Sequence, residues 1–391
     1  MKLTVSSQEL NKVLQLVSKI LPTGNNPNFG ILKYFLFEVE GNILTITASN
    51  LELTSRVKLT VDEADEDFKI AIEGERLLGL LRLIPDEPII LEVLQQNGPE
   101  EEVISNALFV KLSHTKGHYS LLADNADVYP AVSNLLEDDD KVKKILLPAL
   151  ALKRGLQSTY FAMMPESGER LHLAGVYFDL KGDKINIVAT DTQRLATYTY
   201  NIETPLEEKG FIVPGRVINF LRALNVSYEG DVEILFDEKN VLFRFPENIE
   251  VISQLVEGNF PDYEKVMSFD VKYYVNIDRV EFINALKRVN LVSDKSSHFI
   301  GVDITNEDFI IKAKDNGLMV QGEEHLRADS NVEHYELGLN GKYLSDILNN
   351  IDSSVISLRL AEENIMPIRF EPFENEDENE KIEVILVGMK L

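Results

Sequence analysis

Cysteine and tryptophan are absent from this sequence of 391 residues, and only six of its residues are histidine. Without cysteine the chain forms no disulfide bond, thiolate metal centre or thiol nucleophile. No apolar run reaches the roughly 18 residues that a membrane-spanning helix requires. Gln8, Glu9, Asn11 and Lys12 interrupt the N-terminal stretch in which a signal peptide would carry its apolar core. We therefore expect a cytoplasmic protein that has no membrane partner.

The sequence motifs of enzymes and cofactor sites are absent as well. There is no glycine-rich phosphate loop, no G-x-G-x-x-G and no H-E-x-x-H. His114 and His118 lie four residues apart, but the residues between them predict a hairpin turn rather than a metal site. We predict no catalytic residue, no metal ligand and no cofactor. Because carboxylates are plentiful, a carboxylate-dependent hydrolase stays open as an alternative.

Basic residues are outnumbered: 39 Lys and Arg stand against 65 Asp and Glu, which gives a formal net charge of −26. Nucleic acid repels such a chain at long range unless the basic residues are gathered on one surface. Six helical segments together contain twelve basic and five acidic residues, a net charge of +7 that leaves −33 for the rest. Glu forms helices nearly as well as Lys and Arg, so helix propensity does not explain the missing acids. We predict a functional positive surface made of helices.

A threefold repeat organises the chain. The helical segments predicted from apolar spacing are 7–21, 74–84, 148–162, 214–224, 278–292 and 340–350. Pro214 suits the first turn of its helix, and Asn340 suits an N-cap. Hairpins are predicted in three β-type segments, 34–50, 175–191 and 301–315, with turns at 40–42, 181–183 and 306–307.

Matching residues recur at similar intervals along the repeat. Asn50, Asp191 and Asp315 are 141 and 124 residues apart, and the two aromatic-proline pairs at 129–130 and 260–261 are 131 apart. We predict three tandem α+β domains of about 130 residues, each with two helices and an antiparallel sheet of roughly eight strands. Predicted linkers at 131–143 and 267–272 place the domains at 1–131, 132–270 and 271–391.

Two short segments add a family resemblance. Residues 188–195 (VATDTQRL) and 258–263 (GNFPDY), set within three tandem α+β repeats, resemble the bacterial β sliding clamp, the processivity subunit of DNA polymerase III; the resemblance extends to 337–344 and 388–391. It implies the DNA clamp fold: a head-to-tail homodimer forming a ring, with helices inside and sheets outside. The implied function is to encircle and slide on double-stranded DNA and to tether the replicative polymerase, with no enzymatic or 3′–5′ exonuclease activity.

Basic helices that face a central hole would hold the DNA backbone without reading its sequence. The residues expected to face DNA are Lys12, Lys19, Arg76, Arg82, Lys153, Arg154, Arg216, Arg222, Lys287, Arg288 and Lys342. The acidic segments 61–67, 137–140 and 374–380 are expected to be solvated loops that keep DNA off the outer surface. The loop 23–29 lacks a basic residue that is often found in the family.

The resemblance also implies a pocket between the second and third domains. It would bind short linear peptides of the DNA polymerase III catalytic subunit, the clamp loader, repair polymerases and other clamp-motif proteins. Its residues by motif are Leu173, Thr190, Asp191, Thr192, Arg194, Leu195, Pro261, Lys265, Val266, Met366, Ile385 and Val387.

Within this pocket, apolar walls and polar anchors have separate roles. Leu173, Leu195, Val266 and Ile385 would form the walls, although each could instead be an ordinary core residue. Thr190, Arg194 and the backbone near Pro261 would anchor the peptide. Thr192-Gln193, Lys265 and Val387-Gly388 depart from the residues usual in the family, so an altered peptide preference is expected.

For the homodimer, the resemblance implies a contact between the first domain of one protomer and the third domain of its partner. The expected residues are Tyr119 and Leu121 on an edge strand, and Leu291 and Val292 at a helix end. Without the resemblance, the sequence also allows a tandem-domain protein-interaction scaffold that does not touch nucleic acid. The segregation of basic residues onto helices favours the clamp.

Overall fold

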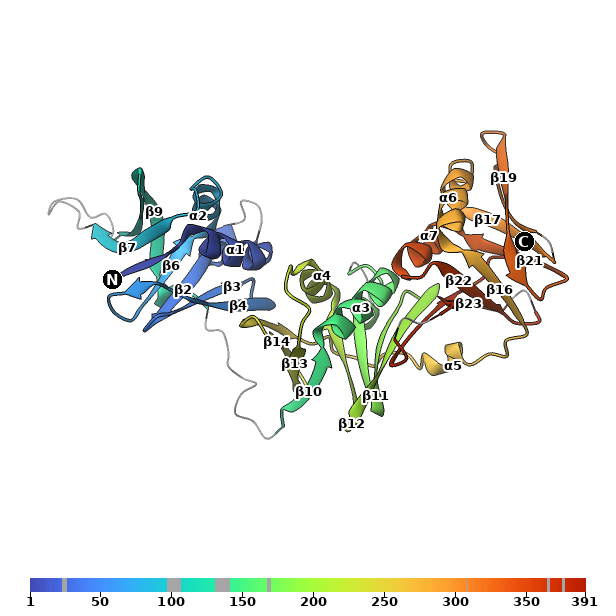
Figure 1. Ribbon diagram of the computed structural model, residues 1–391, viewed down its shortest axis with the longest axis horizontal. Helices are drawn as coiled ribbons and strands as arrows, with labels where there is room; N and C mark the ends of the chain where they lie inside the picture. Colours follow the sequence, from blue (N-terminus) through green and yellow to red (C-terminus); the bar gives the residue numbers. More distant parts are fainter. Residues whose placement is uncertain are drawn as a thin grey trace. The chain divides into compact units, whose positions relative to one another are not determined.

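The computed structural model describes residues 1–22, 27–96, 107–130, 141–166, 170–306, 308–363, 366–374 and 377–391. These residues form two compact units, of which one combines Met1–Ala149 with Ala223–Leu255 and the other combines Leu150–Arg222 with Val256–Leu391 (Figure 1). The predicted acidic segment 137–140 and parts of the loop 23–29 and the linker 131–143 lie outside the described residues. None of the described helices is both long and apolar enough to span a membrane.

The first unit contains a 13-stranded antiparallel sheet in the order β10-β13-β14-β15-β4-β3-β2-β6-β9-β8-β7-β1-β5. Its strands are β1 (Lys2–Ser6), β2 (Tyr34–Glu40), β3 (Ile43–Ser49), β4 (Leu53–Thr60), β5 (Glu63–Ala64), β6 (Phe68–Glu73), β7 (Pro88–Gln96), β8 (Ala107–His114), β9 (Gly117–Asn125), β10 (Lys143–Pro148), β13 (Asp231–Phe236), β14 (Asn240–Phe245) and β15 (Ile249–Gln254). The helices α1 (Ser7–Val17) and α2 (Gly74–Leu81) pack side by side against it (Figure 1). Three 3-10 turns, η1 (Ser18–Ile20), η2 (Pro27–Lys33) and η3 (Ala126–Val128), complete this unit.

The second unit contains a seven-stranded sheet, β11-β12-β24-β23-β22-β16-β20, and a four-stranded sheet, β19-β18-β17-β21. The strands are β11 (Gly175–Thr190), β12 (Arg194–Pro214), β16 (Tyr273–Asp278), β17 (Phe299–Thr305), β18 (Phe309–Asp315), β19 (Val320–Leu326), β20 (Ala328–Ser330), β21 (His334–Asn340), β22 (Val355–Leu360), β23 (Ile368–Pro372) and β24 (Glu380–Leu386). The helical elements are α3 (Ala149–Thr159), η4 (Tyr160–Ala162), η5 (Leu171–Leu173), α4 (Gly215–Ala223), α5 (Glu264–Met267), α6 (Arg279–Asn290) and α7 (Gly341–Asn350).

All six predicted helices are present, and their apolar spacing sets the buried face. In α1, Leu10, Leu14 and Val17 are buried, whereas Lys12 is exposed. Asn340 is the N-cap of α7, as predicted. Its Oδ1 accepts hydrogen bonds from the backbone N–H groups of Lys342 and Tyr343. Pro214 corrects the prediction for α4: it is the last residue of β12, paired with Gly175, and the helix begins one residue later.

The predicted hairpins are also present. β2 and β3 join at residues 41–42, and β8 and β9 join between His114 and Gly117. β17 pairs with β18, and residue 307 of the predicted turn between them lies outside the described residues. Asp179 and Asn186 of β11 both bond the hydroxyl of Tyr263. Seven residues of straight strand would span about 23 Å, so β11 must reverse between them, as predicted, near Gly182 with its φ of 55°.

The acidic residues of segment 61–67 are exposed, as predicted, but the segment is not entirely a loop. It contains the short strand β5, which pairs with β1, and Val61 is 2% exposed. In the segment 374–380, Glu380 begins β24 and forms an ion pair with Arg154. Acidic composition therefore did not exclude strand pairing, because a strand needs only one apolar face.

Main-chain pairing crosses both predicted domain boundaries. β15 from the predicted second domain pairs with β4 of the first, from Ile249 opposite Val57 to Ser253 opposite Leu53. β12 of the second domain pairs with β24 of the third, from Arg194 opposite Leu386 to Tyr200 opposite Glu380. The predicted central domain is consequently divided between the two compact units.

A row of alternating charges spans the junction between β4 and β15. Glu233, Arg244, Glu250 and Arg56 lie directly opposite one another on four neighbouring strands. The Arg244 guanidinium contacts Glu250 at 2.9 Å and Glu233 at 2.5 Å, and Arg56 lies 3.9 Å from Glu250. Hydrogen bonds from Lys144, and also from Arg244, hold the pKa of Glu233 below its ordinary value.

We expect Arg244→Ala to lower the free energy of unfolding by about 1–2 kcal/mol, because two half-buried carboxylates would lose their shared cation. Lys144→Ala is the control: Lys144 also contacts Glu233 but lies outside the row and is 55% exposed, so its loss should cost less than about 1 kcal/mol. The lowered pKa of Glu233 makes its contribution full above the ordinary glutamate pKa and lost as pH falls below it. Urea unfolding should therefore show the Arg244 effect shrinking in acid, and an effect that is equal at every pH would contradict this assignment.

Candidate functional site

The turn from β11 to β12 forms the centre of the candidate peptide site. The Thr190 hydroxyl donates to the Arg194 carbonyl at 2.7 Å and accepts from the Thr192 N–H at 3.1 Å. The Asp191 carboxylate accepts from the N–H groups of Gln193 and Arg194, both at 3.0 Å. Thr192 has a φ of 75°, which is strained for a β-branched residue. These bonds hold the strained turn in one shape, with Thr192 and Gln193 exposed at its tip.

Arg194, expected to anchor a peptide, has a structural role in this turn. Its side chain is 8% exposed and contacts Asp191 at 3.1 Å and Asp346 of α7 at 2.7 Å. Its guanidinium also lies 4.5 Å from the ring centroid of Tyr343 and 5.3 Å from that of Phe161. The guanidinium therefore joins the turn to α7 and η4.

The apolar residues expected to form the walls are mostly core residues. Leu195 lies opposite Ile385 and packs with Val188 and Tyr263 in one buried cluster. Leu195 and Ile385 are 4% and 1% exposed, and Leu173 is 2% exposed. These three residues are therefore ordinary core residues, the alternative that the sequence left open. Their side chains support the surface from beneath.

A smaller set of the predicted pocket residues reaches solvent. Val266 on α5 is 44% exposed, and Val387, directly after β24, is 41% exposed. The Val387 N–H donates to the Gln193 carbonyl at 2.9 Å, so the chain after β24 lies against the turn. Thr192, Pro261 and Lys265 are exposed, and Met366 is half-buried. Lys265 forms an ion pair with Asp262 at 2.7 Å, and this hydrogen bond raises the pKa of Lys265.

Tyr263 positions this surface, and the sequence prediction had no role for it. Its hydroxyl donates to Asp179 at 2.6 Å and accepts from Asn186 at 3.1 Å, and burial raises its pKa. Phe260 stacks on Tyr177 with ring centroids 4.8 Å apart. The aromatic residues of the 258–263 motif thus face inward and fix the position of α5. In the sequence, the only sign of this role was that Phe260 and Tyr263 flank Pro261 and Asp262 in the motif.

Most of the predicted basic residues lie on exposed helix positions. The exposed members are Lys12, Lys19, Arg76, Arg82, Lys153, Lys287, Arg288 and Lys342, and the half-buried members are Arg154, Arg216 and Arg222.

Some of these basic groups already have partners within the chain. Arg154 pairs with Glu380 at 3.1 Å, and Arg288 forms a two-bond pair with Glu324 at 2.6 and 2.8 Å. The Arg222 guanidinium lies 3.0 Å from the ring centroid of Tyr160, and burial lowers its pKa. Arg154, Arg222 and Arg288 are therefore less suited to phosphate contact than the exposed lysines.

Among the described residues, β19 and β9 each leave part of one edge without a partner strand, β19 as an outermost strand and β9 from inside its sheet. β19 is the outermost strand of the four-stranded sheet. β9 pairs with β8 along its length, but with β6 only through residues 123–125. Along this edge Tyr119 is 42% exposed and Leu122 is 43% exposed. Leu121, predicted for the dimer contact, is 2% exposed, so its side chain belongs to the core and Leu122 takes the outward position.

The predicted contact residues at the helix end fit an exposed surface better. Leu291 directly follows α6 and is 83% exposed, and Val292 is half-buried. Gly322 of β19 lies against Val292, so the helix end and the edge of β19 are neighbours in the second unit.

Sequence models of one family match nearly the whole chain. They are described as the DNA polymerase III beta subunit N-terminal domain, matching residues 1–133, the central domain, matching 146–262, and the C-terminal domain, matching 264–385. The chain is 25% identical over 369 residues to the beta sliding clamp of Haemophilus influenzae, covering 93% of each chain. It is also 25% identical over 386 residues to that of Vibrio cholerae, covering 99% of each.

Solved structures share the fold over the full length. A DnaN sliding clamp (DNA polymerase III subunit beta) from Pseudomonas aeruginosa, bound to griselimycin, matches with a TM-score of 0.87 at 24% identity, covering 100% of both chains. The beta subunit from DNA polymerase of Streptococcus pyogenes matches with a TM-score of 0.88 at 20% identity, again covering 100% of both. The chain therefore belongs to the DNA polymerase III beta subunit family, the beta sliding clamps, which are three-domain, non-catalytic processivity subunits.

Proposed function

We propose that two copies of this chain close head to tail into a ring that encircles double-stranded DNA and tethers the replicative polymerase and other clamp-binding proteins. The observation that carries the proposal is the series of strand pairs at the domain junctions. For this series we use the three domains proposed from the sequence, 1–131, 132–270 and 271–391.

Equivalent strands follow the spacing of the sequence repeat. β4 begins at Leu53, β12 begins 141 residues later, and β19 begins a further 126 residues on. On the other side of each junction, β9, β15 and β24 begin at residues 117, 249 and 380, intervals of 132 and 131. β4 pairs with β15 and β12 pairs with β24. The pair that would complete the series is β19 with β9.

A second copy would supply that missing pair. The unsatisfied N–H and C=O groups of an edge strand favour pairing with another strand. Head-to-tail pairing of β19 in one protomer with β9 in its partner would form two equal junctions, and these close a ring. Leu291, Val292, Tyr119 and Leu122 would supply the apolar part of each contact.

Replacing Leu291 and Val292 by Ala should convert the dimer into monomers of 44.3 kDa, because the contact loses Leu291, its most exposed apolar side chain, together with the neighbouring Val292. Val280→Ala is the matched control, since Val280 lies at the other end of α6 and is 55% exposed. Light scattering distinguishes the two masses. A double variant that stays dimeric would place the protomer contact elsewhere.

DNA contact in this proposal is made through exposed lysines and arginines on the helices. Lys12, Arg76, Lys153, Lys287 and Lys342 come from five of the six repeat helices, and each is exposed. Spread over several helices, such contacts hold phosphates and carry no information about base sequence. That property suits a ring that must slide.

Replacing Lys12, Lys153 and Lys342 together by Ala should weaken retention on nicked circular DNA and flatten its salt dependence. Each lost phosphate contact removes about 0.9 from the slope of log affinity against log salt. Lys58, Lys239 and Lys314 form the matched triple, because they are exposed but lie on strands or turns. The proposal fails if the control triple changes the slope as much as the helix triple does.

Partner peptides would bind at the exposed surface formed by Val266, Val387, Thr192 and the half-buried Met366. The buried cluster around Leu195 and Tyr263 keeps this surface rigid beneath the peptide, which lowers the entropic cost of binding. The tether raises the local concentration of polymerase near its template to about the millimolar range, so a modest peptide affinity suffices.

Val266→Asp combined with Val387→Asp should weaken binding of a C-terminal peptide of the replicative polymerase at least about tenfold, because each charge replaces an apolar contact. Calorimetry measures this, and the dimer mass should not change. Val271→Asp is the control, since Val271 is also 41% exposed but precedes β16. Leu195→Asp would be a poorer test because a charge at a 4% exposed position damages the core. Unchanged affinity in the double variant would move the peptide site away from this surface.

A further inference from the structure

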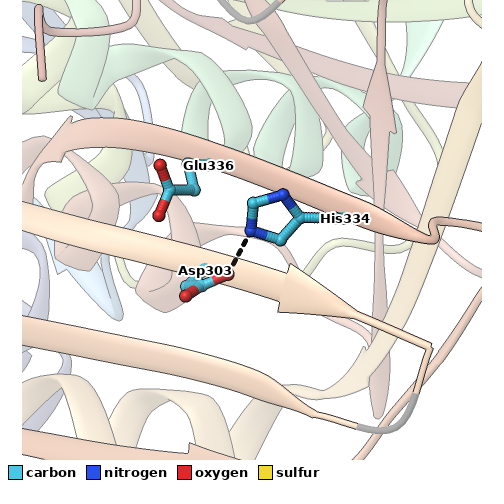
Figure 2. A group of neighbouring side chains, drawn as sticks. All are labelled: Asp303, His334 and Glu336. Carbon is cyan, nitrogen blue, oxygen red and sulfur yellow. Dashed lines mark ion pairs between the residues drawn. The ribbon is translucent and has the colours of Figure 1, made fainter.

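Three side chains that the clamp function does not use converge on the four-stranded sheet. Asp303 lies on β17, and His334 and Glu336 lie on β21 (Figure 2). Asp303 is directly opposite Glu336, and His334 is two residues from Glu336, so all three project from the same sheet face. One ligand atom of each residue lies within 4.8 Å of the other two.

The distances suit a shared metal ion. His334 Nε2 lies 3.4 Å from Asp303 Oδ1. Two ligands bound to a tetrahedral Zn²⁺ at about 2.0–2.1 Å lie roughly 3.3 Å apart. Movement of the exposed Glu336 side chain, without movement of the backbone, would bring its carboxylate to the third position.

The Asp303 carboxylate has two different surroundings. Its Oδ2 lies 3.8 Å from the Lys312 ammonium. Its Oδ1 is buried and accepts no hydrogen bond from the described part of the chain, although it faces the imidazole. A buried carboxylate oxygen without a well-aligned hydrogen bond is costly, and the imidazole at 3.4 Å pairs with it only when protonated, so a bound cation would remove that cost. The Lys312 ammonium lies beside one oxygen of Asp303, and the other oxygen points toward His334.

We propose that Asp303, His334 and Glu336 bind a divalent first-row transition ion of the Zn²⁺ class. One imidazole nitrogen and two carboxylate oxygens favour such an ion over Mg²⁺ or Ca²⁺, which prefer oxygen ligands alone. Water would complete the coordination, because Glu336 and His334 are exposed. This inference does not depend on ring formation or DNA binding.

The ion would crosslink two neighbouring strands. β21 also pairs through Gly338 with Met389, in the chain segment that follows Val387. A metal that binds only the folded state raises the free energy of unfolding by RT ln(1 + M/Kd), where M is the free metal concentration. Metal binding would therefore stabilise the sheet edge against which the last residues of the chain pack.

His325 provides a matched control within the same sheet. Its Nδ1 lies 3.9 Å from Asp308, and its Nε2 lies 3.9 Å from Glu323. The two carboxylates thus approach opposite nitrogens of the ring, so no single ion can bind all three through one nitrogen. The residue types are the same as in the proposed site, but the ligand atoms do not converge.

Calorimetric titration of the untagged full-length protein with Zn²⁺ alone tests the site, in buffer with excess Mg²⁺ to occupy weak carboxylate sites. We expect one site per chain, weakened at least tenfold by His334→Ala and by Asp303→Asn, and unchanged by His325→Ala. Zn²⁺ should also raise the melting temperature of the wild type and of His325→Ala, but not of His334→Ala. Melting in chelator confirms that each variant is folded. Equal Zn²⁺ affinity in the wild type and His334→Ala, or equal loss in His325→Ala, would overturn the proposal.

Discussion

Main-chain hydrogen bonding between strands of different repeats is the interaction on which this structure depends. Each repeat folds a sheet that ends in a strand with unsatisfied backbone groups, and the next repeat supplies the strand that satisfies them. The ladders of β4 with β15 and of β12 with β24 do this within one chain. Around the first of them, opposite charges alternate from strand to strand, so backbone pairing and side-chain pairing favour the same register. The proposed ring extends the same principle to a second chain.

The second ladder also determines the geometry of the candidate peptide surface. Leu195 and Ile385 face each other across it, and the turn before Leu195 is held by Thr190 and Asp191. Arg194 then connects that turn to α7 through Asp346. The exposed residues at this surface are few, but the residues beneath them come from both sides of a domain junction. A partner peptide would thus bind where two repeats are joined.

The helices, hairpins and repeat spacing could be predicted because they follow from local apolar periodicity and turn residues. The resemblance also brought together residues that the structure places around one turn. Burial could not be predicted: strand alternation puts Leu195 on one face, but only the packing of Tyr263 and Met267 shows that this face is covered. The partner of Arg194 lies 152 residues away in sequence, so no local signal could identify it. The same holds for Leu121 and Leu122, where the register of β9 decides which side chain is outward.

The division of the central repeat between two units has a consequence for how the chain folds during synthesis. The sheet of the first unit is complete only when β13, β14 and β15 have joined it, and β15 ends at Gln254. Until the ribosome has made those residues, β4 is an unpaired edge strand whose backbone N–H and C=O groups are exposed. Such an edge can pair with strands of other nascent chains. The first third of the protein therefore presents an unpaired strand edge until the central repeat has been made. Its vulnerable period lasts through the synthesis of about a further 130 residues, several seconds or more at usual translation rates.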